Sequence, residues 1–90
     1  MKLFLVYNKP VMVDDIDYYR IKDKTWCLNK GKYNNSFYAM YGVRNGKKVK
    51  KVYLHRMIAN AVEGDRVEFI NNNTLDCQRS NLRKNGKRIV

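Results

Sequence analysis

The stretch Phe37-Tyr-Ala-Met-Tyr-Gly-Val-Arg-Asn45-Gly46-Lys-Lys-Val-Lys-Lys-Val-Tyr-Leu54 contains the strongest local folding signal in the chain. Asn45-Gly46 lies between two strand-like runs, 37–43 and 48–54. An Asn-Gly pair in that position is typical of a tight β-hairpin, because both residues tolerate a positive φ. The sequence therefore predicts an antiparallel hairpin that turns at Asn45 and Gly46.

The second strand of this hairpin is strongly basic. Alternation along a strand places Val49 and Lys51 on one face and Lys48 and Lys50 on the other, so cations project from both faces near the tip. A positive arm of this kind is suited to reaching a groove or a phosphate backbone. A solvated hairpin would have the same chemistry, so the pattern alone leaves a solubilising role open.

The residues before the hairpin indicate short elements. Asp14 and Asp15 are typical of a helix start, with a carboxylate at the cap and acid in the first turn. Trp26 is expected to be buried by a strand. The expected elements are, in chain order, a buried strand over Leu3–Tyr7, a turn over 8–10, extended chain over 11–13, a helix from Asp14 that stops by Lys24, and a strand over 25–28.

The residues after the hairpin change to a helical spacing. Met57, Ile58 and Ala61 fall on one helical face, and Gly64 supplies a stop. The elements expected there are a helix from His55, a strand over Val67–Ile70, a turn over Asn71–Asn73, and a final helix from Thr74 or Asp76 to Asn85-Gly86. We therefore expect an α+β fold with a small antiparallel sheet and short helices. It forms a single domain over 1–90, with strands and hairpin over 1–54 and a helix-containing segment over 55–86.

The charge balance points to a polyanionic partner. The 90 residues hold 19 Lys and Arg against eight Asp and Glu, a net charge of +11, and residues 44–90 carry +8 of it. So large a charge on one small domain repels itself unless a polyanion such as double-stranded DNA neutralises it. The predicted phosphate contacts are Arg44, Lys47, Lys48, Lys50, Lys51, Arg79, Arg83, Lys84, Lys87 and Arg88.

Several classes of site can be excluded from the sequence. The chain has no G-x-S-x-G, no Gly-rich phosphate loop and no dinucleotide fingerprint. A zinc site of Cys27, His55 and Cys77 would lack a fourth ligand and regular spacing. The longest apolar run, Leu3–Tyr7, is too short for a membrane span or the core of a signal peptide. We expect a cytoplasmic protein with no membrane partner.

One further pattern covers nearly the whole chain. Leu54-His-Arg-Met-Ile58 is followed by Val67-Glu-Phe-Ile-Asn-Asn-Asn-Thr-Leu-Asp-Cys-Gln-Arg-Ser-Asn-Leu-Arg83. This resembles the HNH endonuclease family of the small phage and intron type, in which L-H-R precedes V-D-H-I-N-G-N-x-L-D-N-R-x-S-N-L-R. The upstream residues that also match are Val13-Asp14-Asp15 with Asp17, Trp26, Tyr38-Ala39 and Val52-Tyr53.

The resemblance implies a C-terminal ββα-metal motif, in which a hairpin and a helix hold one divalent cation, Mg²⁺, against a phosphate. By this likeness Glu68 and Asn81 are the metal ligands, and Phe69 stands where the general-base histidine is expected. Cys77 replaces the middle asparagine, and Asn72 replaces the turn glycine. Alternative roles for the two ligands are a surface carboxylate at Glu68 and a loop-tethering amide at Asn81.

The departure at Phe69 decides the expected function. Phenylalanine cannot accept a proton, and losing a positioned general base typically costs about 10²–10⁴ in rate. His55, the only histidine, is the remaining candidate for a base. We therefore expect a degenerate HNH-type protein, encoded by a phage or mobile element, that binds double-stranded nucleic acid, requires no cofactor and cuts weakly or not at all.

Two alternatives stay open at this point. One is a working Mg²⁺-dependent nicking or homing endonuclease that uses Glu68, Asn81 and a metal-bound hydroxide or an unconventional base. The other is a phage interaction protein that binds and inhibits a host nucleic-acid-processing complex.

Overall fold

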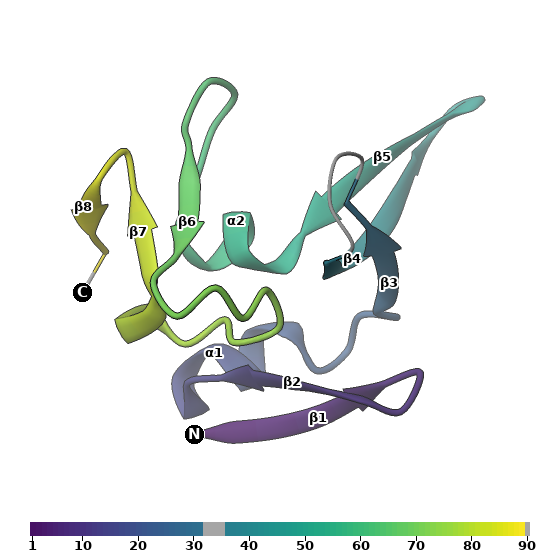
Figure 1. Cartoon of the computed structure of the whole chain (residues 1–90). Coiled ribbons are helices and arrows are strands. Elements are labelled where there is room, and N and C mark those ends of the chain that lie inside the picture. The colour runs from purple at the N-terminus through teal and green to yellow at the C-terminus, as the bar shows by residue number, and fades with distance from the viewer. Residues whose placement is uncertain (32–35, 90) are drawn as a thin grey trace.

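A computed structural model describes residues 1–31 and 36–89. The elements are β1 (Lys2–Val6), β2 (Lys9–Val13), α1 (Asp15–Ile21), β3 (Cys27–Lys30), β4 (Phe37–Asn45), β5 (Lys48–Tyr53), α2 (Leu54–Ile58), β6 (Val67–Phe69), the 3₁₀ turn η1 (Arg79–Asn81), β7 (Leu82–Lys84) and β8 (Lys87–Arg88). The strands form three antiparallel sheets in the orders β1-β2, β3-β4-β5 and β6-β7-β8. The α+β prediction is confirmed, but the single sheet becomes three, because α1 and α2 separate the strand groups along the chain (Figure 1).

The β1-β2 sheet buries one face only. Phe4 pairs with Val11 in register, and Val11 is fully buried. Leu3 and Leu5 project from the other face and are 53% and 63% exposed. The prediction of a buried strand over Leu3–Tyr7 is therefore correct for alternate residues and wrong for the rest, since a two-stranded sheet has no second layer on its outer face.

Helix α1 begins where the sequence predicted, although Asp14 does not cap it in the expected way. Asp14 is extended, with φ −69° and ψ 151°, and its side chain makes no capping hydrogen bond to the helix. Its carboxylate instead accepts the backbone N–H of Arg79 at 3.0 Å. After the helix, the half-buried Trp26 donates its ring N–H to the Ile21 carbonyl at 2.9 Å, and the strand begins one residue later at Cys27.

The predicted hairpin is confirmed as β4 and β5, with its turn shifted by one residue. Asn45 is the last residue of β4 and pairs with Lys48, so Gly46 and Lys47 form the turn. Gly46 has a φ of +64°, a conformation that glycine adopts without steric cost. The Asn45-Gly46 signal therefore located the hairpin correctly, with only Gly46 in the left-handed region.

Helix α2 follows β5 directly and is shorter than predicted. It ends at Ile58 rather than near Gly64, and Asn60 has a φ of +53°. The Arg56 guanidinium donates to the carbonyls of Val62 and Asp65, both at 2.8 Å, and so holds the following loop against the helix. These tertiary hydrogen bonds favour an early helix end over continued helical spacing.

The predicted final helix is wrong. Residues 79–88 form η1 and the β7-β8 hairpin instead, and within 1–31 and 36–89 no α-helix follows α2. Asn81 fixes this path, because its amide oxygen accepts the Asn71 N–H and its amide nitrogen donates to the Asp76 carbonyl, both at 2.9 Å. The expected ββα motif is therefore not confirmed, because strand β7 occupies part of the stretch where its helix was predicted.

The core lies where the β1-β2 layer, α1, α2 and the C-terminal segment meet. Its buried members are Val6, Val11, Val13, Ile21, Ala39, Leu54, Ile58, Cys77 and Leu82. The chain over 75–77 runs beside β2, with Met12 donating its N–H to Leu75 and accepting that of Cys77 at 2.9 and 2.8 Å. Both cysteines are free. No described helix is long and apolar enough to cross a membrane.

Candidate nucleic-acid interface

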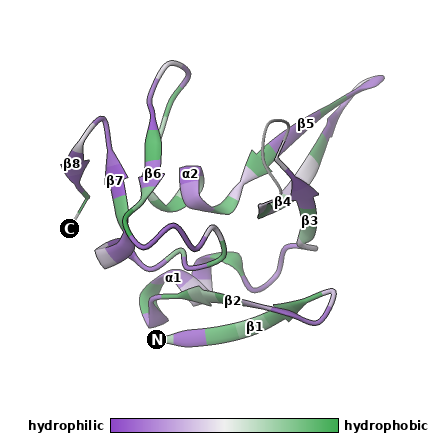
Figure 2. Cartoon of the chain, viewed as in Figure 1, coloured by the Kyte–Doolittle hydropathy of each residue, from purple (hydrophilic) through white to green (hydrophobic). Residues whose placement is uncertain are grey.

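The β4-β5 hairpin projects from the body of the molecule as an arm, which we define as residues 44–51 (Figure 1). Every position from Gly42 to Lys51 is exposed. The register pairs Val43 with Lys50 on one face and Gly42 with Lys51 on the other, so cations line both faces as predicted. Figure 2 shows that the tip is hydrophilic throughout. The arm cations are Arg44, Lys47, Lys48, Lys50 and Lys51.

The C-terminal hairpin, β7 and β8, brings like charges face to face. Arg83 pairs with Arg88 and Lys84 pairs with Lys87 across the two strands. Like charges directly opposite each other are destabilising in an antiparallel pair. The turn between them is tight, with φ +53° at Asn85 and +82° at Gly86. This hairpin therefore concentrates positive charge at a cost to its own stability, which a bound anion would relieve.

No acidic residue lies in the arm, and most of the carboxylates are bonded within the fold, including Asp65, which accepts from Asn85 in the turn of the C-terminal hairpin. Five carboxylates accept bonds from other partners, namely Asp14, Asp15, Asp17, Asp65 and Asp76. At Asp65 the Val62 N–H, followed by the Asn85 amide, lowers the pKa of the carboxyl below its usual value. In the parts of the chain that the structure describes, no ion pair involves a cation of the arm. The positive charge of the arm is therefore not balanced by an ion pair within the described residues.

An open hollow of about 730 Å³ lies beside the base of the arm. One wall is a face of the β3-β4-β5 sheet that presents Asn29, Tyr38 and Tyr53, with the Asn29 amide donating to the Tyr53 hydroxyl at 2.7 Å. Helix α2 contributes His55 to the lining, and β6 contributes Phe69, whose ring packs beside those of His55 and Tyr38. We call this the aromatic hollow; its remaining lining residues are Lys30, Gly31, Lys51, Arg56 and Val67.

His55 belongs to the aromatic cluster of this hollow. Its ring centroid lies 5.0 Å from that of Phe69, 5.6 Å from Tyr38 and 5.8 Å from Tyr53. Burial, followed by the nearby Arg56 charge, lowers the pKa of His55 to about 4. The imidazole is therefore neutral at pH 7, and a group with so low a pKa is a weak proton acceptor near neutrality.

The two predicted metal ligands have different surroundings. Glu68 is exposed and pairs with Arg83 across the sheet, on the face of β6 opposite to Phe69. Asn81 is buried, and both ends of its amide are bonded to the loop it holds, which is the tethering role that the sequence left open. A search of the described residues for groups of three or more His, Cys, Asp or Glu suited to a metal ion finds none.

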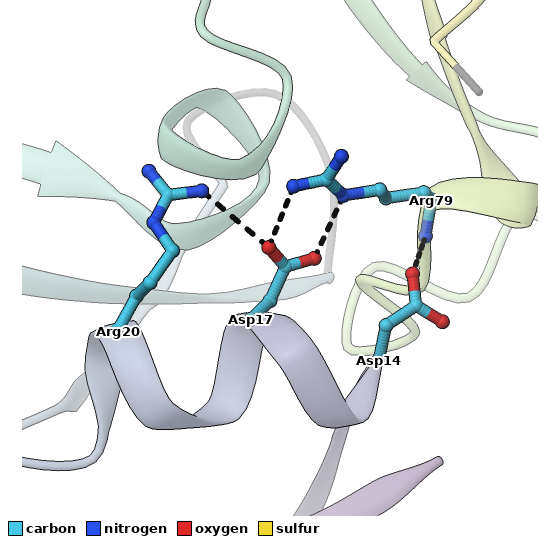
Figure 3. Close-up of polar contacts among 4 residues, drawn as sticks. All are labelled: Asp14, Asp17, Arg20 and Arg79. Carbon is cyan, nitrogen blue, oxygen red and sulfur yellow. Dashed lines mark hydrogen bonds and ion pairs between the residues drawn. The ribbon is translucent and has the colours of Figure 1, made fainter.

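Arg79 differs from the other predicted phosphate contacts because its side chain has an internal partner. It donates to the two carboxylate oxygens of Asp17 at 3.0 and 2.8 Å, and this hydrogen bonding raises the pKa of the guanidinium (Figure 3). The Arg20 guanidinium lies 3.4 Å from the same carboxylate. Part of the hydrogen-bonding capacity of Arg79 is therefore committed within the fold.

Sequence reasoning missed the aromatic hollow. In the sequence, Tyr38 and Tyr53 belong only to the stretches that resemble the HNH family, and no pattern gives a role to Asn29. Their common face follows from the register of three strands, in which Asn29 pairs with Tyr38 and Met40 pairs with Tyr53. The run of cations in the sequence was enough to predict the arm. No local sequence pattern predicts that Asn29, Tyr38 and Tyr53 lie on one face of the sheet.

Comparisons of this chain with family models, with curated proteins and with solved structures found no match.

Proposed function

We propose that this protein binds nucleic acid, in the first instance double-stranded DNA, through the arm and the C-terminal hairpin. The observation that carries the proposal is the arrangement of positive charge: the arm presents exposed cations, and the C-terminal hairpin pairs like charges across its strands, with Lys87 and Arg88 exposed. A solubilising surface usually mixes charges of both signs. A phosphate backbone offers regularly spaced negative charges to which both hairpins can bind.

The proposed binding does not lead to efficient cleavage. Phe69 offers no proton acceptor, and His55 is held among rings with a pKa of about 4. Glu68 and Asn81 lie in different surroundings, one exposed and one buried in a hydrogen-bonded loop. The HNH-like pattern is, in this proposal, that of a chain that retains binding without cleavage, and Mg²⁺ is not required.

The experiment is a salt titration of binding to a fluorescently labelled DNA duplex, followed by anisotropy in EDTA. If about five cations engage phosphates, the logarithm of the affinity falls with the logarithm of salt concentration at a slope near −4 to −5. Replacing Lys48 and Lys50 together by glutamine should reduce that slope by about 2. The matched control replaces Lys2 and Lys22, which lie on β1 and after α1, with the same loss of charge.

Two results would contradict the proposal. One is an affinity that hardly changes between low and moderate salt. The other is an equal loss of affinity in the arm variant and in the control variant, because net charge alone would then explain binding. Supercoiled plasmid incubated with the protein and Mg²⁺ or Mn²⁺ should stay supercoiled, which tests the absence of cleavage separately.

A second candidate function, binding of a host protein complex, is favoured by a row of exposed apolar side chains on β1 and the turn after it. Leu3, Leu5 and Tyr7 are 53%, 63% and 72% exposed. Apolar groups in such a row are typical of interaction surfaces. A pull-down from nuclease-treated lysate tests it: a protein retained by the wild type should be lost when Leu5 is replaced by lysine. Retention by both would count against this surface.

A further inference from the structure

The aromatic hollow has the size of a ligand-binding site and is lined by aromatic rings. Its volume of about 730 Å³ lies within the range of about 300–1,000 Å³ that is typical of ligand sites. Tyr38, Tyr53, His55 and Phe69 are each half-buried, so each ring keeps part of its surface open. The four rings pack against one another, with centroids 5.0 to 6.4 Å apart, and so form one continuous aromatic surface on which a flat ligand can stack.

The polar groups of the hollow suit the edge of a heterocycle. The Asn29 amide uses one N–H for the Tyr53 hydroxyl, and an amide has a second N–H and a carbonyl acceptor. His55 is neutral at pH 7, so its imidazole has one donor and one acceptor nitrogen. The hollow thus combines π faces with neutral donors and acceptors, which is how proteins recognise unstacked bases.

The charges of the hollow favour a ligand attached to phosphate. Lys30 and Lys51 are exposed residues that line it, and none of its lining residues in the described chain is acidic. Lys51 is also the last cation of the arm, so the surface proposed to bind phosphates leads directly to the hollow. A purely apolar ligand would gain nothing from these cations, whereas a nucleotide within a strand would use both features.

We propose that the aromatic hollow binds a single unstacked nucleobase of a nucleic acid whose phosphates lie along the arm. This inference rests on the proposed function and adds the part of the nucleic acid that is recognised. The base stacks against the rings of Phe69 and Tyr53, and Lys51 binds the adjoining phosphate.

Three duplexes of the same sequence test the inference. The first is fully paired, the second carries one extra thymidine as a bulge, and the third carries an abasic residue at that bulge, so the second and third have equal phosphate counts. We expect the thymidine bulge to bind at least about five-fold more tightly than the abasic bulge, the lower limit for one stacked base. Equal affinity for the two bulged duplexes would overturn the inference.

A matched pair of variants assigns the effect to the hollow. In Phe69→Leu the preference for the thymidine bulge should disappear while binding of the fully paired duplex is unchanged. In Phe69→Trp, which keeps an aromatic face, the preference should remain. A preference that survives in Phe69→Leu would overturn the assignment, and circular dichroism with thermal unfolding checks that both variants are folded.

A measurement on the unmodified protein covers the case in which a variant fails to fold. With 5-iodouracil in the bulge, irradiation should crosslink the base to a peptide that contains Tyr38, Tyr53, His55 or Phe69. A crosslink confined to other peptides would overturn the inference. Absence of binding to all three duplexes would instead refute the proposed function, so the two failures are distinguishable.

Discussion

Arg79 donates two parallel hydrogen bonds to Asp17, a residue 62 positions earlier in the chain, and Asp17 is fully buried (Figure 3). The Nε–Oδ2 distance is 3.0 Å and the Nη2–Oδ1 distance is 2.8 Å. The backbone N–H of Arg79 is bound by Asp14, at the start of the same helix. Two motifs that the sequence analysis treated as parts of a nuclease signature thus fasten α1 to the C-terminal segment.

The first prediction concerns the stability that this ion pair supplies. Arg79→Ala leaves the buried Asp17 carboxylate with only the longer contact to Arg20 at 3.4 Å. Because an uncompensated buried charge is costly, the free energy of unfolding should fall by about 2–4 kcal/mol, measured by urea denaturation. Arg79→Lys should recover part of the loss, since lysine cannot form the bidentate pair. Arg44→Ala, at an exposed position of the arm opposite Val49, is the control and should change stability little.

This prediction also separates Arg79 from the other predicted phosphate contacts. Variants of the arm should lose affinity for nucleic acid without losing stability, because the arm is exposed and its cations have no ion pair among the described residues. If the affinity of Arg79→Ala for nucleic acid falls only in proportion to its folded fraction, Arg79 has a structural role alone. An unchanged unfolding curve would contradict the role given to the ion pair.

The second prediction concerns the like charges of the C-terminal hairpin. In Lys87→Glu, the carboxylate would lie opposite Lys84 across the sheet. An opposite-charge pair in place of a like-charge pair should raise the free energy of unfolding by about 0.5–1 kcal/mol at low salt. The gain should shrink as salt screens the pair. Affinity for nucleic acid should fall in the same variant, and Lys87→Gln should show a smaller change in both quantities.

If Lys87→Glu raises the stability of the protein and lowers its affinity for nucleic acid, the like charges of this hairpin serve binding at the expense of stability. A Lys87→Glu protein that binds DNA as tightly as the wild type would contradict this interpretation of the like charges. Anisotropy at fixed low salt and urea denaturation of the same preparations provide both quantities.

The third prediction is a pH dependence that originates at His55. The pKa of His55 falls from 6.5 to about 4 in the folded protein, chiefly because the ring is buried. Above pH 6.5 the imidazole is neutral in both states, and its contribution to stability is complete. As the pH falls towards 4, the unfolded chain binds a proton that the folded protein does not, so stability is lost by up to about 3 kcal/mol.

The measurement is urea unfolding at pH 7, 6, 5 and 4 for the wild type and for His55→Phe, which keeps an aromatic ring in the cluster. The difference between their free energies of unfolding should change between pH 6.5 and about pH 4 and be constant above pH 6.5. Parallel curves throughout would show that burial of His55 does not depress its pKa in the folded state.

Local signals predicted the parts of the fold that local chemistry determines. Gly46 located the hairpin because a positive φ is cheap only for glycine, and Asp14 marked the start of α1. A final helix was predicted from Thr74 or Asp76 to Asn85-Gly86, but Arg79 in this stretch binds Asp17, and Leu82 enters a strand in which it pairs with Phe69. Tertiary partners that a local pattern does not contain overrode the periodicity.

The candidate site likewise has one part that the sequence predicted and one part that it did not. The arm could be predicted because alternation and charge are both visible along one strand. The aromatic hollow could not, since Asn29, Tyr53 and Phe69 come from three strands and meet only through strand register and the packing of α2. The tethering role of Asn81 likewise depends on the path of the loop that it holds.

The last prediction concerns Phe69→His, which returns a proton acceptor to the position that the HNH resemblance assigns to the general base. We expect this variant to bind DNA and still not nick supercoiled plasmid in Mg²⁺. A restored base alone is insufficient, because both ends of the Asn81 amide are bonded within the fold, to Asn71 and to Asp76, and so are not free to bind a metal ion. Agarose-gel separation of supercoiled and nicked plasmid measures the result. Nicking by this variant that disappears on further replacement of Glu68 by alanine would show that a metal site assembles on DNA, and that only the base had been missing.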